Sequence, residues 1–434
     1  MIRIAADWLV TAADRPPLAD HGLIVDGGSV AAVGPNADLA VSHPGVESVR
    51  AGVVAPGFVD THMHLYGVLA HGIPLATAPT GFWSFLDDFW WPKVEDALDH
   101  EMIATATEWV CAELLASGVT TFYDILEAPF AIPDALLVQK EVVERMGNRG
   151  ILSFEATERA GNGVVGLDEN VRLIEACRGT GGLVSGMMSY HTTFTCSEAF
   201  IHEAFDRAAD LGVLCHAHVN EGVHEPDWCL EHLGMRTFEF YERIGVASDR
   251  FLASQCVQLS ESERRIVVDS GVRCAHMPLS NCEVGGGIAP VPELVGAGVT
   301  MGLGTDGYIT DFFEVMRGAF LIHKARLTDP TVLPAHAVFG MATEKGANAL
   351  GLEMVGRLEP GWAADLQILT GDVPTPIRDH NLFDQIVLWR NRSHVTDVMV
   401  AGEWRVRNGD VLDFDRERVR ARVGEQAERM WAKT

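Results

Sequence analysis

Eight short apolar runs recur along the chain, and each is closed by a polar residue. They begin at Gly52, Gly118, Gly150, Gly186, Gly212, Arg250, Gly271 and Gly298. The segments between them have helix-like ends: Glu101–Ser117 stops at a glycine, and Ser260 with Glu263 forms a Ser-x-x-Glu capping box. Near-continuous apolar strands that alternate eight times with helices predict an α/β fold, a (β/α)8 TIM barrel and not an open sheet.

Both ends of the chain carry β-strand patterns that lie outside this alternation of strands and helices. Gly22–Gly34 and Asp397–Gly409 are strand–turn–strand patterns with Gly in the turn, and Gly356–Leu369 adds another strand. Because neither end could bury a core alone, we expect them to pair in one small β-sandwich domain beside the barrel. The predicted division is a β-sandwich from residues 1–53 and 356–415, a barrel over 54–355, and a solvated C-terminal helix over 416–434.

Composition limits the classes of partner. Of the 434 residues, 47% are hydrophobic and 21% are charged, so the chain can bury a large core. A formal net charge of −27 repels phosphate backbones and anionic lipids, which argues against nucleic-acid and membrane-surface binding and favours a small neutral or cationic ligand. No apolar run is long enough to span a membrane, and Asp7 and Asp14 interrupt the N-terminal segment. We therefore expect a cytoplasmic protein, and its eight scattered cysteines are typical of reduced thiols.

The polar residues that close the eight runs point to an active site, since the C-terminal strand ends form the active-site face of such a barrel. Four of the eight ends carry histidine, although the chain has only 17. His62 and His64 alone could mark a strand that runs into a polar loop, but the shared location favours a metal site. The closing residues are His62 with His64, Asp124, Glu155, His191, His216 with His218, Gln255, His276 and Asp306.

Four segments in this order resemble the amidohydrolase superfamily, in its cytosine deaminase/chlorohydrolase branch. They are PGFVDTHMHL, HAHVNE, HMPLSN and GLGTDG. Other stretches, such as FTCSE and GTDGYITDFFE, are most similar to the SsnA group of aminohydrolases. The resemblance covers nearly the whole chain, and each motif gains weight from its place in the ordered set.

This resemblance implies a ligand set. It places His62 and His64 on the first strand, His218 on the fifth and Asp306 on the eighth as metal ligands. Three imidazoles and one carboxylate suit a divalent transition metal, Zn²⁺ first and Fe²⁺ second, with a position left for an activated water. No lysine closes the fourth strand, so a bridging carbamylated lysine is absent and one metal ion is expected.

The resemblance also implies catalytic roles. Glu221 matches the proton shuttle, with an ordinary loop glutamate as the alternative, and Asp306 would also accept a proton from the attacking water. His191 and His276 match substrate-contacting positions, although packed histidines would look the same. His216 is expected in the core. Gln255 stands where relatives carry histidine, and glutamine can orient a group but cannot exchange a proton.

Aromatic residues supply candidate substrate contacts. Trp83 and Trp91 lie in the insertion Gly81–Trp91, and Phe194 and Tyr308 follow strand ends; each could instead serve packing. The leading hypothesis is a metal-dependent aminohydrolase acting on a small nitrogen heterocycle. The alternatives are the same machinery with another leaving group or a cyclic amide, and a metal-binding but catalytically degenerate homologue. A homo-oligomer, most simply a dimer, is also expected.

Overall fold

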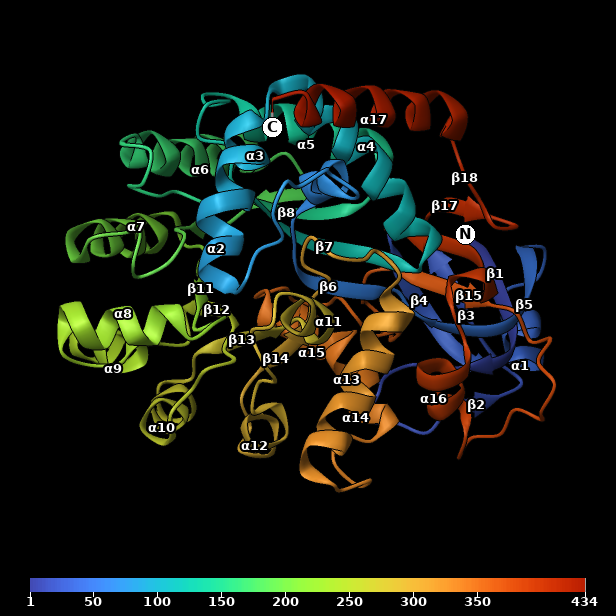
Figure 1. Ribbon diagram of the computed structural model, residues 1–434. Helices are drawn as coiled ribbons and strands as arrows, with labels where there is room; N and C mark the ends of the chain where they lie inside the picture. Colours follow the sequence, from blue (N-terminus) through green and yellow to red (C-terminus); the bar gives the residue numbers. More distant parts are fainter. Residues whose placement is uncertain (434) are drawn as a thin grey trace.

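A computed structural model describes residues 1–433, so the last residue of the predicted C-terminal helix lies outside the described part. Its centre is a closed parallel barrel (Figure 1). The fourth strand is interrupted and counts as two segments, and the last strand pairs with the first to complete the circle. In order around the barrel the strands are β6 (Phe58–Met63), β7 (Val119–Leu126), β8 (Arg149–Phe154), β9 (Val184–Gly186) with β10 (Met188–Ser189), β11 (Cys215–Val219), β12 (Phe251–Gln255), β13 (Arg273–His276) and β14 (Met301–Leu303). The predicted barrel is confirmed.

Helices connect these strands and surround the barrel (Figure 1). Their ends follow the expected chemistry: the Ser260 side chain accepts a hydrogen bond from the Glu263 amide, and α7 ends at Gly212 in a left-handed conformation. The main helices are α4 (His100–Ala116), α5 (Ala135–Met146), α6 (Gly163–Cys177), α7 (Glu198–Leu211), α8 (His224–Leu233), α9 (Thr237–Arg243), α10 (Glu261–Ser270), α11 (Pro278–Glu283), α12 (Val291–Gly296), α13 (Phe312–Leu327), α14 (Ala335–Met341) and α15 (Glu344–Ala349).

The first crossover, between β6 and α4, is built from short helical pieces. They are the 3₁₀ turns η1 (Leu65–Ala70) and η3 (Glu95–Ala97), the helices α2 (Phe82–Phe85) and α3 (Trp91–Lys93), and between these the π-turn η2 (Leu86–Trp90). The aromatic insertion is therefore helical, so neighbouring side chains point in different directions. This helical geometry determines which of the aromatic rings reach the site.

A second, mixed sheet joins the two ends of the chain, as the sequence predicted. Its path runs β18-β17-β16-β15-β5-β1-β3-β4, with β2 attached to β1, and it encloses a separate apolar core that includes Ile4, Leu23 and Leu366. The sequence placed a single barrel strand from Gly52; instead β5 runs to Pro56 in this sheet and β6 starts at Phe58. The bounds are β1 (Ile2–Leu9), β2 (Leu18–Ala19), β3 (His21–Asp26), β4 (Ser29–Pro35), β5 (Glu47–Pro56), β15 (Leu366–Leu369), β16 (Val395–Val400), β17 (Glu403–Arg407) and β18 (Asp410–Val411), with α1 (Asn36–Ser42), α16 (Leu382–Asp384), η4 (Gln385–Trp389) and η5 (Arg392–His394) beside them.

The C-terminal helix α17 (Arg416–Trp431) is not simply solvated. It packs on α4 and η1, with Val419 and Met430 fully buried. Arg418 pairs with the buried Glu108 of α4 at 2.7 Å, and the Trp431 indole donates a hydrogen bond to the Leu69 carbonyl of η1. The expectation of a solvated helix is wrong for this face, because apolar residues spaced along one side of the helix needed cover.

Two further observations bear on the compartment. Within residues 1–433, no helix is long and apolar enough to cross a membrane. All eight cysteines are unpaired, and all but Cys177 and Cys282 are buried.

Candidate metal centre and active site

The barrel brings three histidines from two strands to one point. Ring nitrogens of His62 and His64, from β6, and His218, from β11, lie within 4.8 Å of one another. Asp306 follows β14, and its Oδ1 lies 3.4 Å from His64 Nε2 and 3.9 Å from His62 Nε2. These are the four side chains that the sequence grouped as metal ligands, and they share one location because parallel strands of a barrel end at one face.

The donor set fits a metal ion. His62 is fully buried, yet neither of its ring nitrogens has a hydrogen-bond partner among residues 1–433, and such an orphaned group costs about 1–3 kcal/mol. Burial, together with the nearby His218, holds the pKa of His62 well below its usual value, so the ring is neutral and able to ligate. Neutral imidazoles and a carboxylate are the donors that Zn²⁺ and similar divalent ions prefer.

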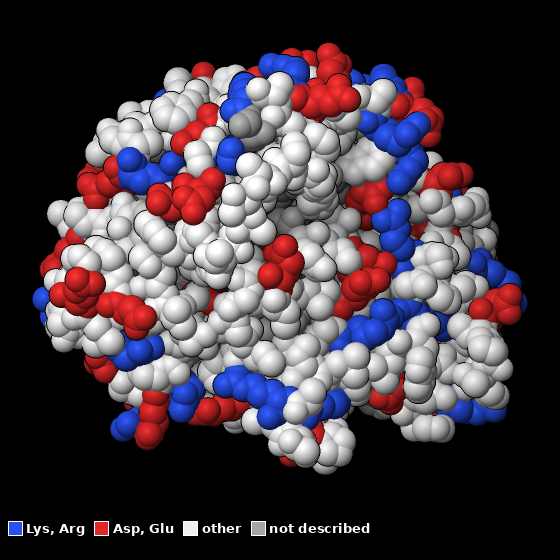
Figure 2. Space-filling model, in the orientation of Figure 1, with Lys and Arg blue, Asp and Glu red and all other residues white. Residues whose placement is uncertain are grey.

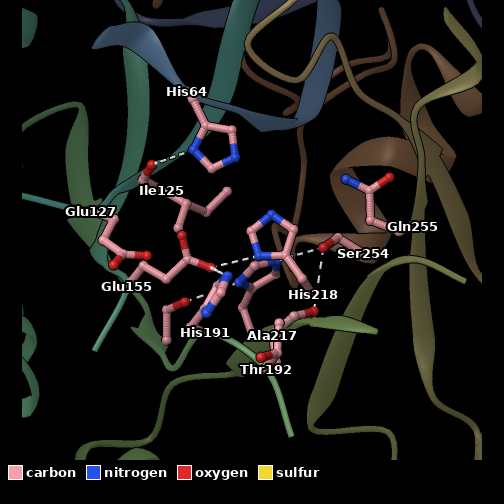
Figure 3. Close-up of polar contacts among 12 residues, drawn as sticks. His64, Ile125, Glu127, Glu155, His191, Thr192, Ala217, His218, Ser254 and Gln255 are labelled. Carbon is pink, nitrogen blue, oxygen red and sulfur yellow. Dashed lines mark hydrogen bonds and ion pairs between the residues drawn. The ribbon is translucent and has the colours of Figure 1, made fainter. Parts of the chain in front are cut away.

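Neighbouring groups fix the orientation of two proposed ligands. His64 Nδ1 lies 2.7 Å from the Ile125 carbonyl, so Nδ1 carries the proton and Nε2 faces the cluster (Figure 3). Asp306 Oδ2 accepts hydrogen bonds from Gln255 Nε2 and Ser280 Oγ, both at 2.9 Å. Burial raises the pKa of Asp306, but its interactions with the neighbouring His62, His64 and His218 rings outweigh burial and lower it, which favours the ionised carboxylate.

Glu155 is a candidate site residue to which the sequence assigned no role. Its Oε1 lies 2.5 Å from His218 Nδ1 and 4.0 Å from His191 Nε2, and Figure 3 shows its carboxylate turned toward these rings. Burial lowers the pKa of His218, yet the charge of Glu155 outweighs burial and raises it. In the neutral ring that a metal requires, the contact with Glu155 keeps the one proton on Nδ1 and leaves Nε2 for the metal. Its position after the third strand was noted, but no motif marked it as part of the site.

Glu221 stands beside the cluster, as the sequence predicted. Its side chain lines the cavity in front of His218 and Asp306. Burial, and next the charge of Asp306, raise the pKa of Glu221 to about 8, so the carboxyl holds a proton at neutral pH. A protonated acid beside a metal cluster can deliver that proton to a bound ring.

With this geometry in view, comparison with known proteins assigns the family. Residues 53–405 match the amidohydrolase family. The chain belongs to the amidohydrolase family. It is 32% identical to a 5-methylthioadenosine/S-adenosylhomocysteine deaminase of Pelotomaculum thermopropionicum, over 95% of this chain and 94% of that one. It is 30% identical to a 5'-deoxyadenosine deaminase of Methanopyrus kandleri, over 95% of this chain and 96% of that one.

Two solved structures resemble this amidohydrolase over almost their full length. An adenosine deaminase from Xanthomonas campestris with bound zinc superposes with a TM-score of 0.91 at 25% identity, covering 99% of this chain and 98% of that one. The zinc complex of the atrazine chlorohydrolase TrzN from Arthrobacter aurescens gives a TM-score of 0.87 at 25% identity, covering 98% and 100%. The family and fold expected from the ordered motifs are confirmed.

The amidohydrolase has a cavity of about 390 Å³ over the cluster. His64, His191, His218, Glu221 and Asp306 form its polar floor, and its aromatic wall comes from Phe82, Phe85, Phe89, Trp90, Phe194 and Tyr308. Phe194 therefore lies where the sequence expected it. Trp83 and Trp91 do not line the cavity: Trp83 stacks on His224 with ring centroids 4.1 Å apart, and Trp91 is buried beneath the Arg159 guanidinium.

Three other residues singled out from the sequence lie outside the cavity lining. His276 Nε2 is 3.1 Å from His323 Nε2 inside the barrel, so the structure does not place it against a ligand in this cavity. His216 contacts the hydroxyls of Ser189 and Ser254, as expected of a core residue. Gln255 contacts Asp306 through Nε2, while its Oε1 accepts a hydrogen bond from Asn281, so it touches a proposed ligand and not the cavity.

Proposed function

We propose that this amidohydrolase is a deaminase of adenosine-type nucleosides that uses one divalent metal ion, Zn²⁺ in preference to Fe²⁺. The observation that carries the proposal is the cluster of three histidines and Asp306 beside a cavity that Glu221 also lines. The deaminase names of relatives that cover nearly the whole chain support the reaction class.

The ion would be held by His62, His64 and His218 through ring nitrogens and by Asp306 through Oδ1. When bound, such an ion lowers the pKa of a water ligand toward neutrality and so supplies a nucleophile. Glu155 would hold His218 in the ligating tautomer, and the Ile125 carbonyl does the same for His64.

Protons are handled by the chain itself. Deamination forms a C–O bond and breaks a C–N bond, so a ring nitrogen must be protonated first and the amine must leave as ammonia. Glu221 would give its proton to the ring nitrogen, and Asp306 Oδ2 would accept one proton from the attacking water and pass it to the departing amine. The proton of the hydroxyl left on the ring carbon would then return to Glu221, so that one water is consumed and ammonia and the oxo product are released. Gln255 and Ser280 donate to that same oxygen, and we assign them the role of holding the Asp306 carboxylate in one orientation.

The cavity suits a nucleoside. Its volume of about 390 Å³ falls in the range of about 300–1,000 Å³ typical of small-molecule pockets. Aromatic walls offer flat faces for a purine ring, and His191 lies on the floor with Nδ1 held by Thr195 Oγ1 at 2.9 Å. Together with the names of the relatives, these features support a nucleoside as the heterocyclic substrate. Assembly as a dimer stays a prediction, to be tested by measuring the molar mass in solution.

Ammonia release from the metal-loaded protein tests the proposal. We expect ammonia from adenosine, 5'-deoxyadenosine and methylthioadenosine, and slower release from free pterins or triazines. Chloride release from a chlorinated triazine without ammonia from any nucleoside would instead favour the second candidate, a different leaving group, to which the likeness to the atrazine chlorohydrolase points. Turnover of none of them would favour a degenerate metal-binding protein.

A further inference from the structure

Among residues 1–433, the Asp and Glu residues that line the cavity are not balanced by any Lys or Arg of the lining. These acidic residues are Glu95, Glu155, Glu221, Glu225, Glu283 and Asp306. The face in Figure 2 is hollowed near its middle, with acidic side chains beside the hollow. A concave surface lined by one sign of charge attracts ligands of the opposite sign.

Most of these carboxylates already have a partner. Glu225 accepts hydrogen bonds from the backbone amides of Thr193 and Asn220. Glu95 accepts from the Tyr66 hydroxyl at 2.9 Å and pairs with Arg159 at 3.2 Å. Glu155 faces His218, and Asp306 belongs to the metal cluster.

Glu283 and Glu221 are the two carboxylates of the lining whose side chains make no hydrogen bond or ion pair within residues 1–433, and of these two Glu283 is the exposed one. Glu283 is the last residue of α11, and its exposure places it at the rim of the cavity. His71 also lines the cavity, with its Nε2 3.1 Å from the Gly307 carbonyl, and its charge acts on Glu283. The rim therefore presents a carboxylate with no hydrogen bond or ion pair, and with the His71 imidazole as a basic neighbour, to any substituent that projects from a bound heterocycle.

The wall beside this rim can also stabilise a cation. Phe85 and Trp90 stack with centroids 5.4 Å apart, and both line the cavity with Phe82 and Tyr308. Aromatic faces attract ammonium groups, most strongly where water is partly excluded. His71 and Tyr308 are the exposed hydrogen-bond donors on this side of the cavity, and among residues 1–433 no Lys or Arg lines it to pair with an anionic substituent.

We propose that the cavity selects nucleosides whose sugar carries a cationic substituent over those carrying an anionic one, and that Glu283 sets this preference. The inference rests on the proposed deaminase function and names the charge class of its substrate. The heterocycle would lie over the metal cluster, and its substituent would point to the rim between Glu283 and the aromatic wall.

Three adenosine derivatives that differ only at the 5' carbon test this inference. In place of the hydroxymethyl group of adenosine, the probes carry an aminomethyl group, a methyl group or a carboxylate. For each probe, the dissociation constant is measured by calorimetry and kcat/KM by ammonia release, on the metal-loaded protein. We expect the amine to be favoured over the carboxylate, and Glu283→Gln to reduce that ratio roughly 5- to 50-fold. Glu283→Lys should invert the order, and added salt should reduce the preference of the parent.

Asp210→Asn is the matched control, because Asp210 is an exposed carboxylate of α7 outside the cavity lining. It should leave the ratio unchanged. Equal or better binding of the carboxylate by the parent, or a ratio that Glu283→Gln and Glu283→Lys do not move, would overturn the inference. Ammonia without charge discrimination would leave the proposed function standing and reject the inference. Tighter binding of the amine than of the carboxylate, without ammonia release from any probe, would support the inference and reject the proposed function.

Discussion

Glu155 and Gln255 show how single residues tune a cluster that they do not join as proposed ligands. Each contacts one proposed ligand: Glu155 lies against His218 Nδ1, and Gln255 donates to Asp306 Oδ2. A ligand held in the right tautomer and orientation binds a metal more tightly, because less freedom is lost on binding. Substitution of either residue should therefore change a measurable property, the metal affinity or the rate of turnover.

Glu155→Gln should weaken metal binding about 10- to 100-fold, because the amide no longer attracts a proton to His218 Nδ1. Competition with a calibrated chelator measures this without any substrate. Glu141→Gln, at an exposed position of α5, is the control and should leave affinity unchanged. If Glu155→Gln bound metal as tightly as the parent, Glu155 would have no part in orienting His218.

Glu221→Gln should retain the metal and the fold but lower turnover by a factor of about 10² or more, since glutamine cannot supply the proton for the ring nitrogen. Steady-state ammonia release, with metal content measured on the same sample, separates the two effects. Near-normal turnover would remove Glu221 from the mechanism.

Gln255→Ala removes one of the two side-chain donors to Asp306 Oδ2 and should lower kcat roughly 10- to 1000-fold. Gln255→His restores a donor that titrates near neutrality, so it should recover part of the rate and change the pH profile. Rates and pH profiles that matched the parent for both variants would show that Gln255 serves packing alone.

At the scale of elements, the strand ends could be predicted from the sequence but the insertion could not. In a parallel barrel every strand ends at the same face, so the closing residues could be expected to meet there, and the family resemblance picked out His62, His64, His218 and Asp306 among them. The insertion is a run of short helices and a π-turn, and this local geometry turns Trp90 inward while Trp83 stacks on His224. The segment is too short for hydrophobic periodicity to predict which of these rings faces the site.

Gln255 illustrates a second limit. It ends β12 with φ 73°, in the left-handed region, so its side chain leaves the direction that strand alternation would give. Sequence reasoning expected it to contact the nucleophile or the substrate, whereas its amide lies between Asp306 and Asn281. Backbone strain of this kind has no signature in residue type.

The helix α17 makes an element-scale prediction. Met430→Ala should lower the free energy of unfolding by about 2–5 kcal/mol, because Met430 is fully buried where α17 packs on the barrel. Denaturant titration measures the loss. Glu425→Ala, at an exposed position of the same helix, should change stability by no more than about 0.5 kcal/mol. Equal effects from the two substitutions would mean that α17 contributes nothing through its buried face.

For the whole molecule, the chain ends and the barrel serve different purposes. The ends meet in the mixed sheet with its own core, while α17 covers η1, the turn that follows His64. The proposed ligands come from β6 and the residue after it, from β11 and from the loop after β14, so the cluster depends on closure of the whole barrel. The net charge of −27 is of the same sign as the charged residues that line the cavity.

Metal stoichiometry tests the central claim most directly. Elemental analysis of the purified protein should find about one transition-metal ion per chain, and His218→Ala should lose it while circular dichroism still shows a folded barrel. His216→Ala, one layer deeper on the same strand, should keep the ion. Full loading of the His218→Ala protein, or a folded parent that binds no metal when Zn²⁺ is supplied, would contradict the account.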